Sequence, residues 1–292
     1  MSEDQAHAIT IIALLGSVFS PYYAGARDAR DGRQADPLDH CAMNVALYGP
    51  RGDRWALTER GSRSVARGER DLAIGPSSME WDGTELRISF DEVTAPIPSR
   101  LRGRVRVRPA GVTGEVLKLD AAGRHVWSPI APVATAEVDL ESPSLRFRGA
   151  AYFDSNAGDE PLERAFSSWT WSRSSRPSET AVTYDVRRAD GSRALIARAF
   201  GAGGEARDLE NLREMPLGLT RWGVDRSIQA DARTSPRLLR TLEDTPFYAR
   251  SLASASFGGQ ASTVVHEALS LDRFKQGWVR FLLPFRMRRE PG

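Results

Sequence analysis

Two short segments contain side chains that together could carry out acid chemistry. They are the tripeptides His-Val-Trp at 125–127 and Tyr-Phe-Asp at 152–154. In an extended chain the first and third residues of each tripeptide share a face, because strand side chains alternate. If the two faces meet, one pocket holds an imidazole, an indole, a phenol and a carboxyl. A carboxyl can donate a proton and aromatic faces can stabilise a cation, so this set suits an electron-rich, apolar substrate.

The same residues also have an ordinary structural interpretation. Aromatic residues on strands usually belong to the core, and an aspartate followed by Ser-Asn-Ala-Gly, as at Asp154, is usually a turn residue. The alternating segment 137–141 between the tripeptides is predicted to be a strand or the end of one. Spacing alone leaves the chemical and the structural interpretations open.

Strand signals dominate the elements that must position these residues. Turn signals recur between the strands, as Asp-Gly and Gly-Gly pairs at 82–83, 190–191 and 258–259. Helical periodicity is scarce, and its best example, 235–243, is short. Such a pattern favours a sandwich or barrel over a parallel α/β sheet. The predicted strands are 54–57, 87–90, 102–107, 115–119 and a buried strand over 9–15, which is followed by a loop over 20–23.

A faint internal repeat suggests two similar β domains. An apolar strand ending in glycine occurs at 7–16 and again at 192–201. Repetition of a supersecondary unit indicates a repeated architecture. We place the boundary near residue 165. This gives an N-terminal domain over 1–165, which contains both tripeptides, and a C-terminal domain over 166–292.

Composition excludes several functional classes. The 292 residues are 41% hydrophobic, which is enough to bury a core and excludes a disordered chain. Forty basic residues are balanced by 38 acidic ones, and no basic run has the spacing of a nucleic-acid module, so no nucleic-acid partner is expected. Four scattered histidines and the lack of a phosphate-binding glycine loop predict no metal and no cofactor. A single cysteine, Cys41, fits a reducing compartment.

The uncharged segment 8–26 is a possible targeting or membrane segment. It follows an acidic start, whereas a signal peptide begins with positive charge. Glycine, serine and proline interrupt it, which is unfavourable for a spanning helix. We therefore predict neither a signal peptide nor a transmembrane helix here.

Several longer motifs resemble a known family. The resemblance is to the acyclic carotenoid 1,2-hydratases (hydroxyneurosporene synthases, CrtC) of phototrophic bacteria, and it runs over most of the chain. The matching motifs are Gly-Ser-Val-Phe-Ser-Pro-Tyr-Tyr-Ala at 16–24, Asp-His-Cys-Ala-Met-Asn-Val-Ala-Leu-Tyr-Gly at 39–49, Trp-Ala-Leu-Thr-Glu-Arg-Gly at 55–61, His-Val-Trp-Ser-Pro at 125–129 and Tyr-Phe-Asp-Ser-Asn at 152–156.

The resemblance implies an all-β fold of two lipocalin-like (calycin-type) antiparallel β-barrel domains packed together. This agrees with the strand pattern and the internal repeat. Family members usually carry more sequence before the first motif, whereas this chain has fifteen residues before Gly16. The closure of the first barrel is therefore an open point.

The resemblance further implies a cofactor-independent hydro-lyase that adds water to the terminal C=C bond of acyclic carotenoids such as neurosporene or lycopene. The implied catalytic residues are His125, Trp127, Tyr152 and Asp154. Asp154 would protonate the alkene, the Trp127 face and Tyr152 would stabilise the tertiary cation, and water held by His125 or Tyr152 would attack. An exposed aspartate is ionised at neutral pH, whereas an apolar pocket raises its pKa by up to about 3–5 units, so we expect Asp154 to be buried.

Four other aromatic residues are candidates for substrate binding: Trp169, Trp171, Tyr22 and Tyr23. Trp169 and Trp171 alternate on one strand face and would line either the pocket or a domain interface. The motif pairs Asp39-His40 and Glu59-Arg60 are interpreted as structural ion pairs or turn contacts.

A carotenoid substrate dissolves in lipid, so the expected location is the cytoplasm, peripheral to the inner (photosynthetic) membrane. The run 278–289 mixes apolar and cationic residues. It fits a peripheral membrane contact or a last barrel strand with a solvated arginine tail. Two other functions stay open: a non-catalytic carrier of an apolar ligand, and a lipocalin-like terpenoid cyclase or isomerase. Hydration and cyclisation both begin with one protonation, so the sequence does not separate them.

Overall fold

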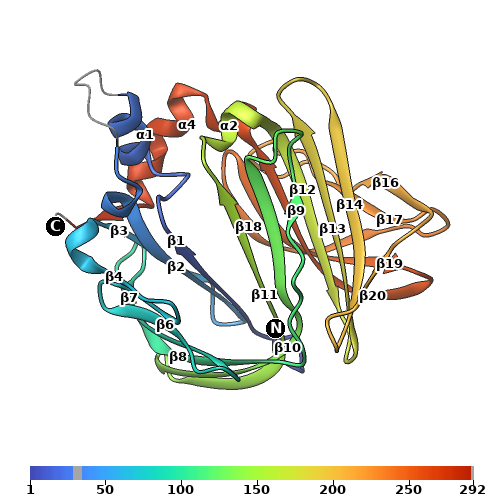
Figure 1. Cartoon of the computed structure of the whole chain (residues 1–292), viewed down its shortest axis with the longest axis horizontal. Coiled ribbons are helices and arrows are strands. Elements are labelled where there is room, and N and C mark those ends of the chain that lie inside the picture. The colour runs from blue at the N-terminus through green and yellow to red at the C-terminus, as the bar shows by residue number, and fades with distance from the viewer. Residues whose placement is uncertain (29–34, 291–292) are drawn as a thin grey trace. The chain divides into compact units, whose positions relative to one another are not determined.

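The computed structural model describes residues 1–28 and 35–290, and strands dominate its regular structure (Figure 1). The chain divides into two compact units. Unit 1 comprises Met1–Arg108, Thr135–Gly149 and Arg280–Gly292, and unit 2 comprises Pro109–Ala134 and Ala150–Val279. Two long strands, β10 (His125–Ser142) and β11 (Leu145–Gly158), run through both. Both tripeptides belong to unit 2, and position 165, the predicted boundary, also lies within it.

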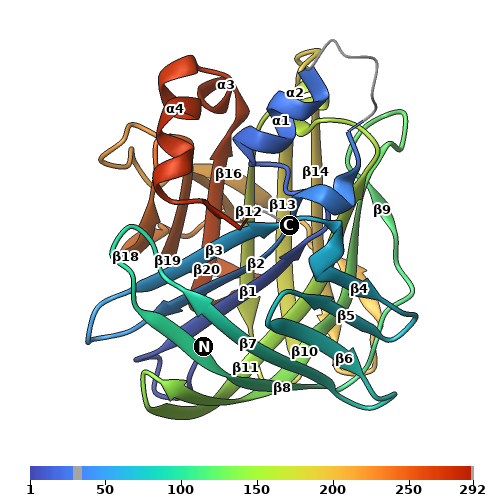
Figure 2. The same ribbon diagram turned by 90° about the vertical axis from the view of Figure 1, so that its left-hand side faces the viewer.

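Unit 1 contains two sheets. In one, β1 (Ala8–Leu14), β2 (Cys41–Tyr48) and β3 (Arg54–Arg60) are neighbours in this order (Figure 2). The short strand β21 (Arg288–Arg289) pairs with β3 in parallel. The other sheet has the strand order β11-β10-β8-β7-β6-β5-β4. Its remaining strands are β4 (Val65–Arg67), β5 (Asp71–Ile74), β6 (Ser77–Trp81), β7 (Leu86–Val93) and β8 (Arg100–Pro109).

Two isolated bridges lie beside the two sheets of unit 1. They join Ser2 to Gly149 and Ala56 to Thr94. The β class and the antiparallel sheets predicted from the sequence are confirmed. However, in the described ranges no sheet closes on itself, so the two closed barrels that were predicted are not observed.

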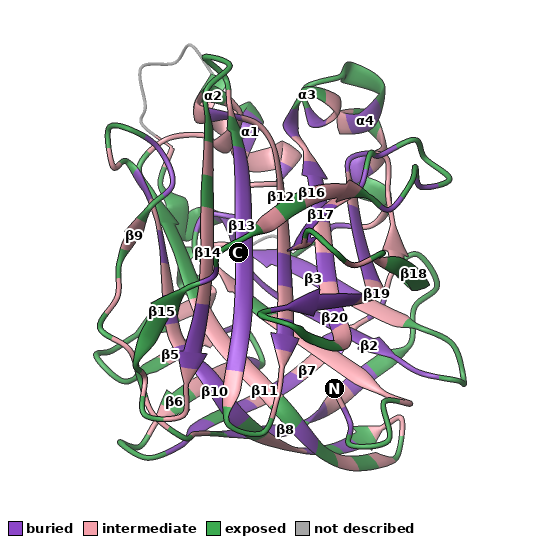
Figure 3. Cartoon of the chain, turned by 90° about the vertical axis from the view of Figure 1, so that its right-hand side faces the viewer, coloured by how far each residue is buried: buried purple, intermediate pink, exposed green. Residues whose placement is uncertain are grey.

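Unit 2 is built around a seven-stranded sheet in the order β15-β14-β13-β12-β20-β19-β18. One face packs on the pair β16–β17 through small and branched apolar residues such as Ala181, Ala253 and Ile228. Strand β13 is almost entirely buried (Figure 3). The strands are β9 (Leu117–Lys118), which pairs with β10, β12 (Phe166–Ser175), β13 (Glu179–Arg188), β14 (Arg193–Gly201), β15 (Ala206–Asp208), β16 (Leu212–Pro216), β17 (Ser227–Asp231), β18 (Arg237–Asp244), β19 (Tyr248–Phe257) and β20 (Gln260–Ser270).

Most strands and turns predicted from alternation are present, but the strand over 9–15 is not buried as predicted: β1 is half-buried and its Ile12 is 39% exposed. Gly83, Gly191 and Gly258 have φ values of 102°, 85° and 60°, as the predicted turns between neighbouring strands require. The segment 235–243, the best candidate for helical periodicity, is not a helix, because most of it belongs to β18, an edge strand paired with β19. Cross-strand pairing outweighs a short helical pattern in an isolated segment.

Short helices lie between the strands: α1 (Pro21–Asp28), α2 (Leu162–Ala165), α3 (Leu271–Phe274), α4 (Gly277–Leu282), and the 3₁₀ helices η1 (Pro37–His40), η2 (Ser62–Ser64) and η3 (Leu283–Phe285). The loop predicted over 20–23 is wrong. Ser20 caps α1, since its Oγ accepts the backbone N–H groups of Tyr22 and Tyr23 at 3.1 and 3.0 Å. None of the helices in the described part of the chain is long and apolar enough to cross a membrane.

Candidate active site

The start of β10 and the end of β11 meet closely in unit 2. The Asp159 N–H donates to the Arg124 carbonyl at 3.2 Å. A side chain at Gly158 would place its Cβ only 2.5 Å from Cδ2 of His125. Glycine at this position therefore lets the two strands approach and lets the His125 ring lie against the backbone.

Asp154 is the centre of the site. Trp127 Nε1–H donates to Asp154 Oδ2 at 2.8 Å, and the Tyr152 hydroxyl donates to the same oxygen at 3.0 Å. Asp154 lies within β11, so its interpretation as a turn residue is wrong. The two strand faces predicted from period-two spacing do meet, and they bring three of the four predicted catalytic residues into direct contact.

The environment of Asp154 favours the neutral acid. Burial is the main cause that raises its pKa to about 6, and the Glu267 charge acts in the same direction. The hydrogen bonds from Trp127 and Tyr152 and the charge of Arg173 act in the opposite direction. The net result is a carboxyl poised to hold or release a proton near neutral pH. As a whole residue, Asp154 is half-buried.

His125 is held by groups other than Asp154. Its Nδ1 is 2.8 Å from Asp120 Oδ2, and its Nε2 is 3.2 Å from the backbone oxygen of Glu160. Burial raises the pKa of Asp120, but hydrogen bonds from His125 and the backbone bring it below its ordinary value. Asp120 is therefore an anion that fixes the orientation of the His125 ring.

Aromatic rings surround this centre. Trp127 is fully buried, with the edges of Tyr184 and Phe200 packed at centroid distances of 5.7 and 6.4 Å. The predicted residue Trp169 contacts Tyr184 at 6.0 Å, and the predicted residue Trp171 contacts Tyr152 at 5.4 Å. The rings that keep accessible surface are those of Tyr152, Trp169 and Trp171.

Sheet register explains why these groups converge. Trp171 on β12 pairs with Tyr184 on β13 and with Glu267 on β20, and Glu267 pairs with Arg250 on β19. Cross-strand neighbours share a face, so one row across the sheet contains two aromatic residues and an ion pair. Arg250 Nε is 2.9 Å from Glu267 Oε1.

Sequence reasoning missed Arg173, Tyr184 and Glu267. Arg173 lies two residues after Trp171 and continues the alternation of Trp169 and Trp171, so extending the strand pattern by two residues could have found it. Its guanidinium lies 5.1 Å from the Tyr152 ring centroid, and burial lowers its pKa. The Nε atom of Arg173 is buried without a hydrogen-bond partner among the described residues. Tyr184 and Glu267 carry no local signal, because long-range strand pairing places them.

The other two predicted binding residues, Tyr22 and Tyr23, lie in α1 of unit 1. Tyr23 stacks on His40 at 4.8 Å, and Arg289 lies 5.0 Å from the Tyr22 ring centroid. His40 pairs with the buried Glu59 at 2.9 Å, as expected of a structural ion pair. A pocket of about 540 Å³ here is lined by polar groups together with Tyr22. A role of Tyr22 and Tyr23 in substrate binding stays a prediction.

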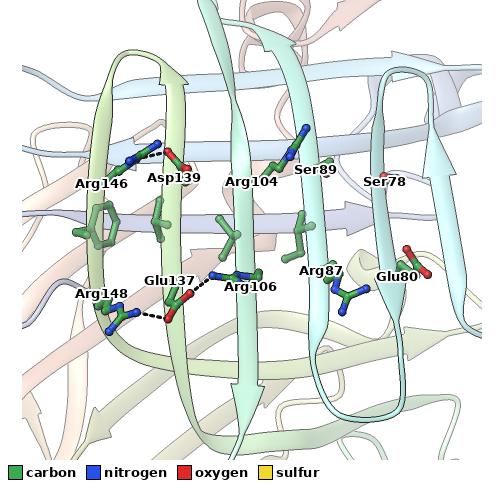
Figure 4. A pocket seen from close by; sticks show the side chains of 14 residues that line it. Ser78, Glu80, Arg87, Ser89, Arg104, Arg106, Glu137, Asp139, Arg146 and Arg148 are labelled. Carbon is green, nitrogen blue, oxygen red and sulfur yellow. Dashed lines mark hydrogen bonds and ion pairs between the residues drawn. The ribbon is translucent and has the colours of Figure 1, made fainter.

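A larger pocket of about 800 Å³ in unit 1 has a strongly charged lining (Figure 4). Arg106 and Arg148 both pair with Glu137, and Arg146 pairs with Asp139 at 2.7 Å. Such ion pairs suit a solvated surface and not an apolar substrate. None of the residues around Asp154 lines this pocket.

The site can therefore perform acid catalysis on an apolar substrate. It has one protonatable carboxyl, two donors that orient it and several aromatic faces. In the ranges 1–28 and 35–290 no cluster of three or more His, Cys, Asp or Glu side chains is arranged to hold a metal ion. Fold and site together define a β-sheet protein with a buried acid in an aromatic setting.

Comparisons with known proteins agree with this class. Residues 11–292 match the family model for the carotenoid hydratase CrtC. An acyclic carotenoid 1,2-hydratase of Thiocapsa roseopersicina is 52% identical over all of this chain and 72% of its own length. An acyclic carotenoid 1,2-hydratase of Rubrivivax gelatinosus is 47% identical over 99% of this chain and 71% of its own length. The chain belongs to the CrtC carotenoid hydratase family and is thus an enzyme, a hydro-lyase.

A solved structure supports the fold. A putative AttH of Nitrosomonas europaea superposes with a TM-score of 0.60 at 13% identity, covering 82% of this chain and 83% of its own. At this identity the likeness concerns the fold alone.

Proposed function

We propose that this enzyme hydrates the terminal C=C bond of an acyclic carotenoid, with Asp154 as the proton donor. The observation that carries the proposal is the pair of hydrogen bonds from Trp127 and Tyr152 to Asp154 Oδ2 in a site that keeps the carboxyl largely protonated at mildly acidic pH. The substrate class follows from the names of the full-length relatives. Lipocalin-like character of the units is part of the same proposal, supported by the consecutive antiparallel neighbours β4 to β8.

The proton is delivered from Oδ1. Both described hydrogen bonds to Asp154 reach Oδ2, so we assign the transferred proton to Oδ1. With a pKa of about 6, about one molecule in ten is protonated at pH 7, compared with about one in a thousand for an exposed aspartate. The proton adds to the alkene carbon that bears hydrogen, and the neighbouring tertiary carbon becomes cationic.

The cation is stabilised by aromatic faces. Trp127 is fully buried and donates to Asp154, so we assign it the orientation of the carboxyl. One face of Tyr152 is covered by the Arg173 guanidinium. Trp171 and Trp169 keep accessible surface and are therefore assigned the contact with the cation, a contact that contributes about 2 kcal/mol or more when it is desolvated.

Water completes the reaction. A water oxygen forms a bond to the tertiary cation, and the proton it loses passes to the Asp154 carboxylate, which restores the acid. Substrate and water thus become one tertiary alcohol, with no external oxidant or cofactor. His125, which is hydrogen-bonded to Asp120 and Glu160, is assigned a positioning role at the start of β10.

The test is product analysis after incubation of the purified protein with lycopene or neurosporene. Hydration gives a product heavier than the substrate by one water. A cyclase or isomerase would give a product of unchanged mass, and a carrier would return the substrate. Either of those two results would refute the proposal.

A further inference from the structure

The segment from α3 to β21 combines strong positive charge with exposed aromatic side chains. Residues 271–289 contain six cationic side chains and one acid, so this segment has a net charge of +5, whereas the whole chain has +2. Trp278, Phe281 and Phe285 are 43%, 70% and 63% exposed. Their spacing of three and then four residues places them on one side of the α4–η3 helical segment.

The opposite side of the same segment is anchored in the protein. Leu271, Phe274 and Val279 are at most 1% exposed, and Leu283 is 9% exposed. The segment therefore has two apolar sides, and only one of them serves the core. An amphipathic surface helix needs only the buried side.

Within unit 2, a loop between β16 and β17 packs beside Trp278. Trp222 is 46% exposed and stacks on Trp278 with centroids 6.2 Å apart, and Leu219 is 66% exposed. The loop is held firmly: Arg273 donates to the Trp222 carbonyl at 2.6 Å, and the buried Arg226 donates to the Leu219 carbonyl at 3.0 Å. Hydrogen bonds thus hold these apolar side chains in an outward position.

We propose that this basic aromatic surface, formed by Trp278, Phe281 and Phe285 of the α4–η3 segment with the cations of residues 271–289, docks on an anionic lipid bilayer. Tryptophan and phenylalanine beside arginine are the residues that insert at the boundary between headgroups and acyl chains. Each cation near an anionic leaflet adds to the attraction. The choice of a bilayer is supported by the proposed function, because an acyclic carotenoid partitions into lipid.

Charge argues against a second copy of this chain as the occupant. In a two-fold symmetric dimer the same patch meets itself, so two segments of +5 would face each other. The sequence also allowed this segment to be a last barrel strand with a solvated arginine tail. In the structure only Arg288–Arg289 is a strand, and helices form most of the segment.

The experiment is flotation of the purified protein with vesicles of phosphatidylcholine, alone or with phosphatidylglycerol. We expect binding to the anionic vesicles, weakened by salt. The double variant F281S/F285S should bind at least roughly ten-fold more weakly, since two phenyl side chains lose their burial in lipid. The matched control I97S/V116S removes two exposed apolar side chains at other positions, 81% and 62% exposed, and should bind as the unaltered protein does.

Activity separates this proposal from the proposed function. F281S/F285S should hydrate a detergent-solubilised carotenoid normally and a vesicle-embedded one slowly. If the unaltered protein floats but hydrates nothing, the proposed function fails and the surface stands. Equal flotation of F281S/F285S and the unaltered protein would overturn the surface. The proposed surface would also be overturned if the unaltered protein failed to float and instead formed dimers or protein complexes that F281S/F285S abolishes.

Discussion

At the scale of single residues, the main feature of the site is that one carboxylate oxygen of Asp154, Oδ2, accepts two hydrogen bonds. Trp127 and Tyr152 both donate to Oδ2, which orients the carboxyl, and the proposed mechanism assigns proton transfer to Oδ1. A general acid works best when its pKa lies near the working pH. Burial moves Asp154 into that range, and the neighbouring Glu267 and Arg173 adjust it in opposite directions.

The pKa of Asp154 predicts the pH dependence of hydration. Activity requires the protonated acid, and its pKa is raised to about 6, so kcat/KM should be level below pH 6 and fall about ten-fold per pH unit above it. The measurement is kcat/KM from pH 5 to pH 8.5, with circular dichroism at each pH to follow the folded fraction. A profile that rises with pH across this range would contradict the assignment of Asp154 as the acid.

Charge neutralisation at Glu267 should shift this profile. Glu267 raises the pKa of Asp154, so Glu267→Gln should lower that pKa and move the falling limb to lower pH. Glu243→Gln is the matched control, because Glu243 also contacts Arg250, at 3.7 Å, but is not among the main groups that shift the pKa of Asp154. An unmoved limb in Glu267→Gln, or equal shifts in both variants, would show that Glu267 does not act on Asp154.

At the scale of elements, local patterns predicted the strands that contain the tripeptides but not their neighbours. Period-two alternation places Trp127 on one side of β10 and Asp154 on one side of β11, and these sides meet. The registers that bring Tyr184 and Glu267 beside Trp171 depend on pairing between distant strands, which no local pattern encodes. The short helical pattern over 235–243 misleads for the same reason, since this segment pairs with β19 as an edge strand.

The close approach of β10 and β11 at Gly158 can be tested directly. Gly158→Ala places a methyl group 2.5 Å from the His125 ring, so the strands or the ring must shift, at a cost of about 1–3 kcal/mol in unfolding free energy. Gly114→Ala, whose Cβ meets open space, is the control and should change stability by about 0.5 kcal/mol or less. Denaturant unfolding measures both variants. Equal stability of the two would mean that the strands are not tightly apposed.

At the scale of the whole molecule, the division into units could not be found from a linear sequence. Strands β10 and β11 each contribute one part to unit 1 and another to unit 2. No change of composition marks a division that runs through a continuous strand, so a single boundary near residue 165 was the simplest interpretation. The internal repeat indicates two similar β architectures but does not locate their junction.

The central claim at this scale is that the chain is a hydratase whose acid is Asp154. The most direct test is Asp154→Asn, compared with the unaltered protein at equal folded concentration. Asparagine keeps the shape and still offers an oxygen to Trp127 and Tyr152, so the fold should survive. We expect product formation to fall by about 10²–10⁴-fold, the typical loss when a general acid is removed. Near-normal formation of the hydrated carotenoid by Asp154→Asn would contradict this account of the mechanism.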